Sequence, residues 1–152
     1  MQTFLPYPDF AESFKVLDSK RLGNQVYREA LTLIKGGWPN HPAAKMWLGH
    51  TRALALYALA GLDELFFRGK DYSQHRTTFE TYRDLAPDTG LPWWFGNEDF
   101  HVSHRSNLLR KNAEHYGPLF GSIPDDLLYL WPDNQTKTFR TIAEKKVKIK
   151  VT

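Results

Sequence analysis

Apolar residues recur at helical spacing near the start of the chain. Within RLGNQVYREALTLIKGG (residues 21–37) they follow one another at steps of three and four: Leu22, Val26, Ala30 and Leu33. This period predicts an amphipathic helix from near Asp18 to Ile34 that stops at the two glycines. Glu29 falls on the border of the apolar face. The neighbouring polar flank carries Arg21, Gln25 and Arg28.

The rest of the chain predicts a mainly α fold. Residues 40–69 are apolar on nearly every turn, which predicts a long, buried central helix with Asn40 as its N-cap. Further helices are expected over residues 73–85 and 99–115. The stretch from 116 to 132 lacks a period, and strand-like alternation occurs only in KVKIKVT at the end. We therefore predict a compact single-domain helical bundle with a long central helix and an irregular, aromatic-rich C-terminal part.

Composition narrows the class of protein. The 152 residues are enough for one domain with its own core, and 14% of them are aromatic. Without cysteine the chain has no disulfide, no thiolate nucleophile and no cysteine-bound zinc. No apolar run reaches the ~18 residues of a membrane helix, and the N-terminus lacks a signal-peptide pattern, so we expect a cytoplasmic protein without membrane contact. No sustained heptad or interface stripe is visible, so we expect a monomer. The net charge of +3 permits binding to nucleic acid.

The helix expected over residues 99–115 carries a candidate nucleic-acid surface. One face and its shoulders hold basic side chains at helical spacing: His101, His104, Arg105, Arg110, Lys111 and His115. Such a face can neutralise backbone phosphates, and Ser103, Ser106 and Asn107 can add neutral hydrogen bonds. An ordinary solvated helix face is the alternative. The HxxH pair of His101 and His104 has no third ligand at a convincing spacing, so no metal is expected.

Two other positions carry competing interpretations. His41 lies in the first turn of a predicted helix, where the helix dipole favours a neutral imidazole that can orient a ligand or relay a proton; a local capping contact is the alternative. Trp93 and Trp94 lie in a loop flanked by Pro and Gly. Because two adjacent indoles are hard to bury in one core, one of them is a candidate stacking platform. A hydrophobic plug over a helix end is the alternative.

Glu29 has two interpretations as well. Beside Arg21 and Arg28 it can be an ordinary salt-bridge partner. As a catalytic group, it would have its pKa raised by partial burial against Leu22 and Val26 and lowered by the arginines. These opposed effects give a carboxylate that can act as an acid or a base near a phosphate. The residues alone leave both interpretations open.

Several stretches resemble the pyrimidine-dimer DNA glycosylase family, the group that contains the phage enzyme endonuclease V. They are MQTFLPYPDF and LDSKRLGNQ, then GGWPNHPAAKMW, SHRSNLLRKNAEHYGPLF and YLWP. The similarity is greatest to a bacterial and phage branch of that family. It implies an endonuclease V-like glycosylase domain over residues 1–132, followed by a basic C-terminal tail over residues 133–152.

The resemblance implies a helical DNA-repair enzyme that acts on double-stranded DNA without a metal or an organic cofactor. In this family a primary amine attacks C1′ of the damaged nucleotide, expels the base and leaves an imine. A helix glutamate assists proton transfer before β-elimination cuts the strand. The motif YRE assigns that glutamate to Glu29, with Arg21 and Arg28 at the flanking phosphates. The residues expected at the DNA are Gln2, Arg21, Gln25, Arg28, His41, Trp93, Trp94, Ser103, His104, Arg105, Arg110, Lys111, His115 and Tyr116.

The second residue departs from the family pattern. The family's nucleophile is the α-amine of a small residue exposed when the initiator Met is removed, whereas here Gln2 is large and normally blocks that removal. The amine of Met1 then becomes the expected nucleophile, because α-amines have an ordinary pKa of about 7.7–8.0 and are partly neutral at pH 7. A lysine such as Lys20, or direct attack by water, are the alternatives.

We therefore predict a DNA glycosylase with AP-lyase activity (strand cleavage at the baseless site) that excises damaged or modified pyrimidines from duplex DNA. Two other hypotheses stay open: a non-catalytic nucleic-acid-binding module, and an enzyme that acts on nucleotides or modified bases in phage DNA modification. The binding module predicts salt-sensitive binding without any product. The small-substrate enzyme predicts little dependence on an extended phosphate track.

Overall fold

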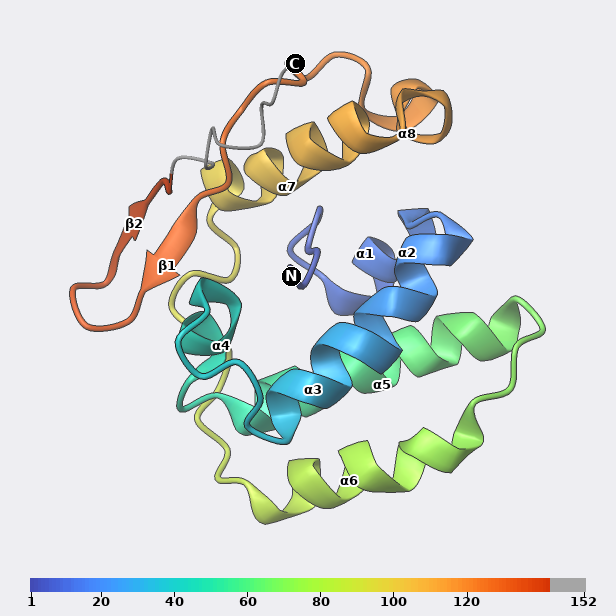
Figure 1. Cartoon of the computed structure of the whole chain (residues 1–152), viewed down its shortest axis with the longest axis vertical. Coiled ribbons are helices and arrows are strands. Elements are labelled where there is room, and N and C mark those ends of the chain that lie inside the picture. The colour runs from blue at the N-terminus through green and yellow to red at the C-terminus, as the bar shows by residue number, and fades with distance from the viewer. Residues whose placement is uncertain (143–152) are drawn as a thin grey trace, which may run out of the picture.

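The computed structural model describes residues 1–142, and its fold is mainly α (Figure 1). The helices are α1 (Phe10–Val16), α2 (Ser19–Asn24), the π-helix η1 (Gln25–Ala30), α3 (Leu31–Ile34), α4 (Pro42–Trp47), α5 (Thr51–Phe67), the 3₁₀ turn η2 (Ser73–His75), α6 (Arg76–Leu85), α7 (Glu98–Lys111) and α8 (Ala113–Phe120). A two-stranded antiparallel hairpin follows, with strands β1 (Trp131–Asp133) and β2 (Thr138–Arg140). The predicted class, a compact and mainly α fold, is confirmed.

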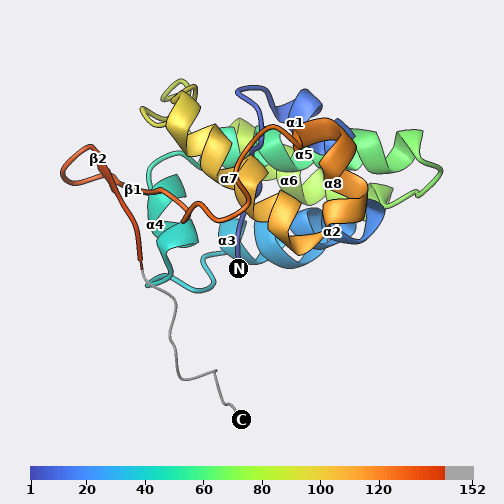
Figure 2. The same ribbon diagram turned by 90° about the horizontal axis from the view of Figure 1, so that it is seen from above.

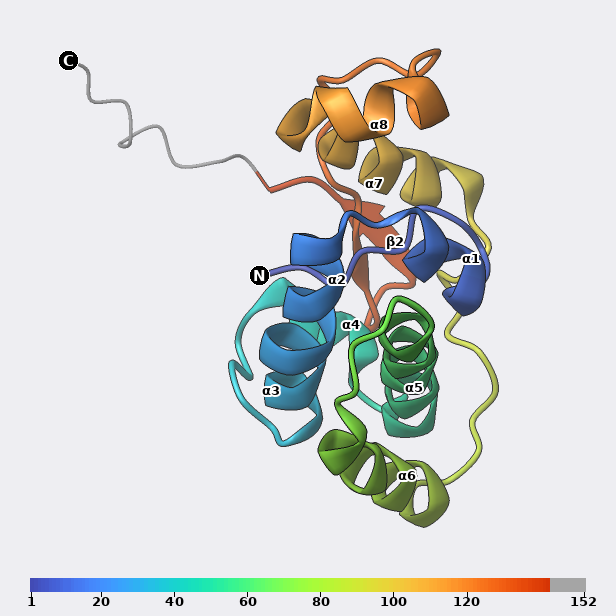
Figure 3. The same cartoon turned by 90° about the vertical axis from the view of Figure 1, so that its right-hand side faces the viewer.

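The helices lie in three tiers, which Figures 1 and 3 show from two directions. α7 and α8 form one outer tier and α6 forms the other, with α1, α2, α3 and α5 between them. α5 packs against both α1 and α6. Its Gly61 permits this close packing, because a Cβ there would lie only 2.5 Å from Val26 Cγ2 and 3.0 Å from Phe14 Cζ. A larger residue at this position would push the central tier apart.

The helix predicted from near Asp18 to Ile34 is present as an unbroken run of α2, η1 and α3. Its middle is a π-helix, whose wider turn changes which side chains face inward. Gln25 and Val26 point into the core, and Glu29 lies half-buried at the edge of the core. Short π-helical segments are frequent at functional sites, and this one carries the candidate catalytic glutamate.

The predicted long, buried central helix is present as α5, but its predicted range of residues 40–69 is wrong, because the structure has two helices there, α4 and α5. The chain turns between them at Gly49, whose φ of +83° lies in the left-handed region that glycine adopts without strain. Pro42 begins α4, but the N-cap is His41 rather than Asn40. The apolar pattern continues across the turn, so periodicity alone does not reveal it.

The single helix predicted over residues 99–115 is also wrong, because α7 ends at Lys111. Asn112 has a non-helical backbone, and its side chain accepts a hydrogen bond from His115 N, which makes it the N-cap of α8. α8 then continues to Phe120, through a stretch that was expected to be irregular. Asn112 therefore separates α7 from α8, although the sequence pattern over residues 99–115 is that of a single helix.

The β-hairpin lies beside α4, at the end of the molecule away from the α5–α6 turn (Figure 2). Phe139 packs against Trp93 and Phe100, with ring centroids 5.0 and 5.9 Å apart. The domain boundary predicted between residues 132 and 133 falls inside this hairpin. The stretch KVKIKVT and half of the predicted basic tail, residues 143–152, lie outside the described residues. No helix within residues 1–142 is long and apolar enough to cross a membrane.

Candidate active site

The start of the chain runs through the middle of the protein, between the α7 tier and the central tier (Figure 1). Residues 2–6 are buried. Side chains of η1, α4, α5 and α7 hold this N-terminal segment by hydrogen bonds: Phe4 N to Gln25 Oε1 (2.7 Å), Leu5 N to His104 Nδ1 (2.9 Å), Tyr57 OH to Phe4 O (2.9 Å) and Trp47 Nε1 to Thr3 Oγ1 (3.0 Å). The segment is therefore fixed by four helical elements, and Met1 lies half-buried at its end.

The predicted cationic face of α7 is largely buried, which corrects the expectation of a nucleic-acid surface there. His101, Ser103, His104 and Arg105 are all buried. His101 Nδ1 lies 2.7 Å from Leu5 O, and Arg105 Nη1 donates to Pro6 O at 2.6 Å. Ser103 donates to Phe100 O at 2.7 Å. These polar groups bind backbone, chiefly that of the N-terminal segment, so they are not available to phosphates.

The residues that follow in this region have different surroundings. Arg110 and His115 are exposed, and they contact Asp125 O at 2.7 Å and Val16 O at 2.9 Å. Tyr116 is buried and donates to Asp18 Oδ1 at 2.5 Å, so a direct contact with DNA is corrected for this residue. Lys111 is exposed and lines a cavity beside Met1. DNA contacts by Arg110, Lys111 and His115 stay predictions.

His104 is expected to make the fold sensitive to acid. Burial, together with the nearby His101, lowers the pKa of His104 from its ordinary value of 6.5 to about 3. The folded protein keeps this ring neutral while the unfolded chain takes up a proton below pH 6.5, so stability should fall as the pH decreases from 6.5 toward 3. Linkage gives a loss of about 2 kcal/mol near pH 5 for this group.

Chemical unfolding of the wild type and of His104→Asn at about pH 7.5 and about pH 5 measures this effect. The asparagine oxygen can accept the Leu5 N–H without titrating. The variant should therefore lose clearly less stability in acid than the wild type. An equal acid loss in the two proteins would contradict the role of His104.

Met1 lies where two cavities meet. The larger, of about 570 Å³, is lined by Met1, Asn24, Arg28, Glu29, Thr32, Trp38 and His41. The smaller, of about 260 Å³, is lined by Met1, Gln2, Phe4, Arg21, Asn24, Gln25, Glu29, Lys111 and Tyr129. Met1, Asn24 and Glu29 belong to both. The predicted nucleophile and the predicted acid/base thus share one open site at the surface.

Glu29 is a half-buried carboxylate without an ion pair within residues 1–142. Its interpretation as a salt-bridge partner is wrong there, because Arg21 pairs with Asp18 at 3.3 Å instead. Burial raises the pKa of Glu29, and the positive charges of the N-terminal amine and Arg28 oppose this rise only in part. The net upward shift favours a carboxyl group that can both give and take a proton.

His41 caps a helix and also lines the larger cavity. It is the N-cap of α4, and its Nδ1 accepts a hydrogen bond from Ala43 N at 3.0 Å, which confirms the capping contact. Its ring also lines the larger cavity. Burial and the positive N-terminal amine lower the pKa of His41, so the ring faces the cavity as a neutral imidazole near pH 7. Its contact with a ligand stays a prediction.

The four polar residues expected at the DNA near the N-terminus divide into two kinds. Gln2 and Gln25 are buried, with their side-chain oxygens accepting from Thr3 N and Phe4 N, so they position the N-terminal segment. Both also line the smaller cavity, and their contact with DNA stays a prediction. Arg28 is exposed at the larger cavity, and Arg21 lines the smaller one. The two guanidinium groups therefore lie on the two cavities that meet at Met1.

Arg21 is held in place by an ion pair with Asp18. Its Nη1 lies 3.3 Å from both oxygens of Asp18, which also accepts from Tyr116 OH. Burial alone would raise the pKa of Asp18, but the hydrogen bond from Tyr116 and the charge of Arg21 lower it. Asp18 is therefore ionised near pH 7 and orients the arginine beside the cavity.

The predicted exposed tryptophan platform at residues 93–94 is wrong. Trp94 is fully buried and donates from Nε1 to Met46 O at 3.1 Å. Trp93 is half-buried and donates from Nε1 to Asn134 Oδ1 at 2.7 Å. Both indoles are accommodated because they pack in different places, Trp94 against Trp47 and Trp93 against Phe139. The alternative interpretation, a hydrophobic plug, is the better description.

Sequence reasoning missed several residues that line the two cavities: Asn24, Thr32, Trp38 and Tyr129. Trp38 carried a usable signal, since it follows two glycines and precedes a proline in a short connection between helices. No feature of the sequence marks Asn24, Thr32 or Tyr129 as site residues, because polar or aromatic residues at helix edges and in loops are common. Within residues 1–142 no group of three His, Cys, Asp or Glu side chains could hold a metal ion.

One known protein family matches the first half of the chain. A model of the family described as pyrimidine dimer DNA glycosylase matches residues 1–80. The chain belongs to this family. No curated protein and no solved structure gives a significant match. Membership of the pyrimidine dimer DNA glycosylase family supports a DNA glycosylase-type function and a DNA substrate.

The matched range contains most of the site. Met1, Glu29 and His41 all lie within residues 1–80, as do both candidate phosphate-binding arginines. Lys111 and Tyr129, which line the smaller cavity, lie beyond it. The range that matches the family model therefore includes both Met1 and Glu29.

Proposed function

We propose that this protein is a DNA glycosylase with AP-lyase activity that removes damaged or modified pyrimidines from duplex DNA. The observation that carries the proposal is the meeting of the Met1 amine and the Glu29 carboxyl group in one open cavity. A primary amine and a carboxyl group with a raised pKa are the two groups that imine-forming base removal needs. Membership of the glycosylase family supports the same reaction class.

The reaction begins with the neutral amine of Met1, whose electron pair attacks C1′ of the target nucleotide. The N–C1′ bond forms, the glycosidic bond breaks, and the departing base takes the bonding pair together with a proton. Protonated Glu29 donates this proton to the departing base and becomes a carboxylate. The carboxylate then takes one proton from the positively charged amine and passes it to O4′ as the C1′–O4′ bond breaks. The sugar ring opens, a protonated imine joins the protein to C1′, and Glu29 is again a carboxylate.

Strand cleavage follows from the same pair of groups. The Glu29 carboxylate removes a proton from C2′, the electrons form a C2′–C3′ double bond, and the 3′ phosphate leaves with the C3′–O bond pair. Water then hydrolyses the imine and returns the free amine. Glu29 acts first as an acid and then as a base, which its raised pKa favours near neutral pH.

The two arginines lie where each can bind a phosphate, one on either side of the reacting sugar. Arg28 lines the larger cavity and Arg21 lines the smaller one, with Met1 between them. Guanidinium groups bind phosphates through paired, charge-assisted hydrogen bonds. We therefore propose that Arg21 and Arg28 bind the phosphates that flank the target nucleotide.

Met1 is favoured over Lys20, the lysine that the sequence analysis names as an alternative nucleophile. Lys20 is exposed and lines neither cavity that contains Glu29. Attack by water would give base release without an imine, and the two routes differ in whether a covalent intermediate forms. The geometry that supports amine attack is the shared position of Met1 and Glu29.

A base-release assay tests the proposed function. UV-irradiated duplex DNA and duplexes with modified pyrimidines are incubated with protein whose N-terminus is native, and free bases and strand breaks are quantified against undamaged duplex. We expect base release and strand breaks on at least one damaged or modified duplex. Salt-sensitive binding without product on every duplex would overturn the proposal and favour a binding module.

A further inference from the structure

Trp38 is the exposed tryptophan among the five in the chain. Its side chain is 61% exposed, whereas Trp47, Trp94 and Trp131 are buried and Trp93 is half-buried. Its ring makes an edge contact with His41, at a centroid distance of 6.4 Å. An indole left this open to water loses the free energy that burial would provide. The indole of Trp38 is therefore open to contact with a ligand.

The backbone at Trp38 is held in an unfavourable conformation. Its φ is +55°, in the left-handed region that bulky residues rarely adopt, and the following Pro39 disfavours that region further. Hydrogen bonds on both sides fix the turn: Gly37 N to Thr32 O at 2.9 Å, and His41 N to Trp38 O at 3.0 Å. Strain of this kind persists where the surroundings impose it, and it occurs often at functional sites.

This turn puts the indole on the wall of the larger cavity, with Met1 and Glu29. A base is joined directly to C1′, so a sugar that reacts with the Met1 amine brings its base into the same cavity. An enzyme that attacks C1′ in a duplex must displace a nucleotide from the stack, and displaced bases are commonly stacked against aromatic side chains. Trp38 offers a flat aromatic face at this place.

We propose that Trp38 stacks on the base of the nucleotide displaced into the larger cavity, and so holds C1′ within reach of Met1. This inference rests on the proposed glycosylase function, which it deepens by naming the residue that receives the base. Stacking does not depend on base identity, because every base has an aromatic face. Trp38 would therefore favour a displaced base without selecting one lesion.

Two variants separate the ring from the backbone. Trp38→Asn removes the aromatic face but keeps a residue that adopts the left-handed conformation readily. Trp38→Phe keeps an aromatic face. Phe67→Ala is the matched control, because Phe67 is 83% exposed at the end of α5 and lines neither cavity at Met1. Thermal unfolding of all three variants verifies that each is folded.

The test compares borohydride trapping rates on two duplexes, one with a damaged pyrimidine and one with an abasic site at the same position. On the damaged duplex, Trp38→Asn should react about 10- to 100-fold more slowly than the wild type, while Trp38→Phe and Phe67→Ala stay within a few-fold. On the abasic duplex, Trp38→Asn should match the wild type, because no base is present to stack.

The outcomes distinguish this inference from the proposed function. If the wild type reacts with both duplexes and Trp38→Asn matches it on both, the stacking role of Trp38 is overturned while the glycosylase function stands. If Trp38→Asn is equally slow on both duplexes, its effect is structural and the stacking role is again overturned. If the wild type reacts with neither duplex and releases no base, the proposed function itself fails.

Discussion

Replacing Glu29 by Gln is expected to slow base release and strand cleavage by about 10²- to 10⁴-fold, the range that a positioned acid or base contributes. Glutamine keeps the size and polarity of the side chain but can neither donate nor accept the proton that the reaction moves. Duplex binding should change by only a few-fold, because the arginines and not Glu29 are proposed to contact phosphates. Single-turnover rates and binding constants on the same damaged duplex measure the two effects.

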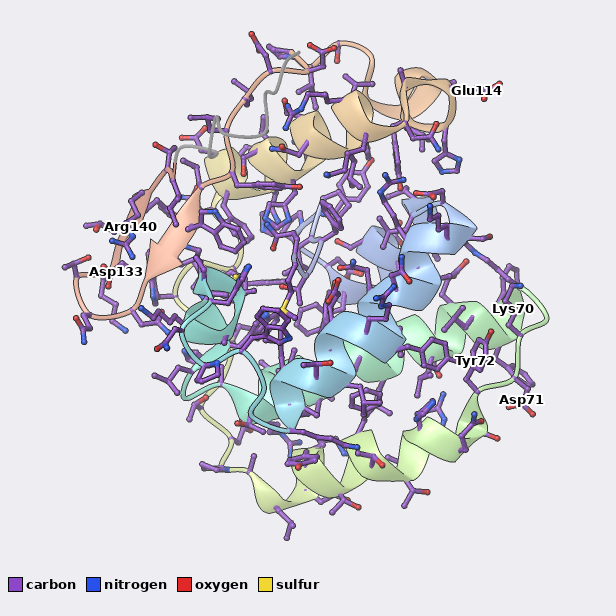
Figure 4. The ribbon with its side chains drawn as sticks, in the orientation of Figure 1. Lys70, Asp71, Tyr72, Glu114, Asp133 and Arg140 are labelled. Carbon is purple, nitrogen blue, oxygen red and sulfur yellow. The ribbon has the colours of Figure 1, made fainter. Side chains whose placement is uncertain are left out.

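Glu114→Gln is the matched control for this substitution. Glu114 is exposed on α8, and Figure 4 shows it at the outline of the molecule, on a different helix from Glu29. The control should react at the wild-type rate. Glu29→Gln with full activity would remove Glu29 from the mechanism, and loss of duplex binding in that variant would show that its effect is not on the chemical step.

The second large effect is expected from extending the N-terminus. Residues 2–6 are buried and fixed by hydrogen bonds, so added residues can only continue outward from Met1 through the cavities. The extension converts the Met1 amine into an amide, which is not a nucleophile, and it fills the space that the sugar needs. A two-residue extension should therefore reduce imine formation at least about 100-fold.

The same two residues added at the C-terminus are the control, and they should leave the rate unchanged. Thermal unfolding of both proteins tests whether the extension disturbs the fold. Wild-type rates of imine formation in the N-terminally extended protein would assign the reaction to a lysine. Wild-type base release without an imine would assign it to water.

The fold class and the position of Glu29 at the edge of the core could be predicted from the sequence for a physical reason. Helical periodicity records which residues face a core, and the steps from Leu22 to Leu33 place one helix correctly. Glu29 stands out because it interrupts the edge of that apolar face. The local pattern thus contains both the helix and the position of its acidic residue.

The surroundings of α7 could not be predicted in the same way. Periodicity identifies a polar face but not what covers it, and here the cover is the N-terminal segment, about a hundred positions away in sequence. In the sequence, His104 and Arg105 look like part of an exposed cationic surface. Their hydrogen-bond partners, the backbone groups of Leu5 and Pro6, lie far away along the chain and cannot be seen in the local pattern. Polar side chains on a helix can equally be anchors for a buried chain segment.

The prediction that Trp93 or Trp94 is an exposed stacking residue is wrong for a related reason. Exposure depends on how a turn directs its side chains, and adjacent indoles can enter separate parts of a core, as Trp93 and Trp94 do. Trp38, in contrast, is directed outward by a left-handed backbone that its own residue type disfavours. Backbone hydrogen bonds on both sides of the turn, from Gly37 to Thr32 and from His41 to Trp38, fix this conformation, so the preferences of the residue type alone do not predict it.

The central claim is that the amine of Met1 attacks C1′, and borohydride trapping followed by peptide mapping tests it most directly. Untagged protein is mixed with a damaged or modified duplex and sodium borohydride, the covalent adduct is isolated and digested, and the DNA-bearing peptide is sequenced by mass spectrometry. We predict an adduct on the N-terminal peptide, at Met1. An adduct on a lysine, or base release with no adduct at all, would contradict the account.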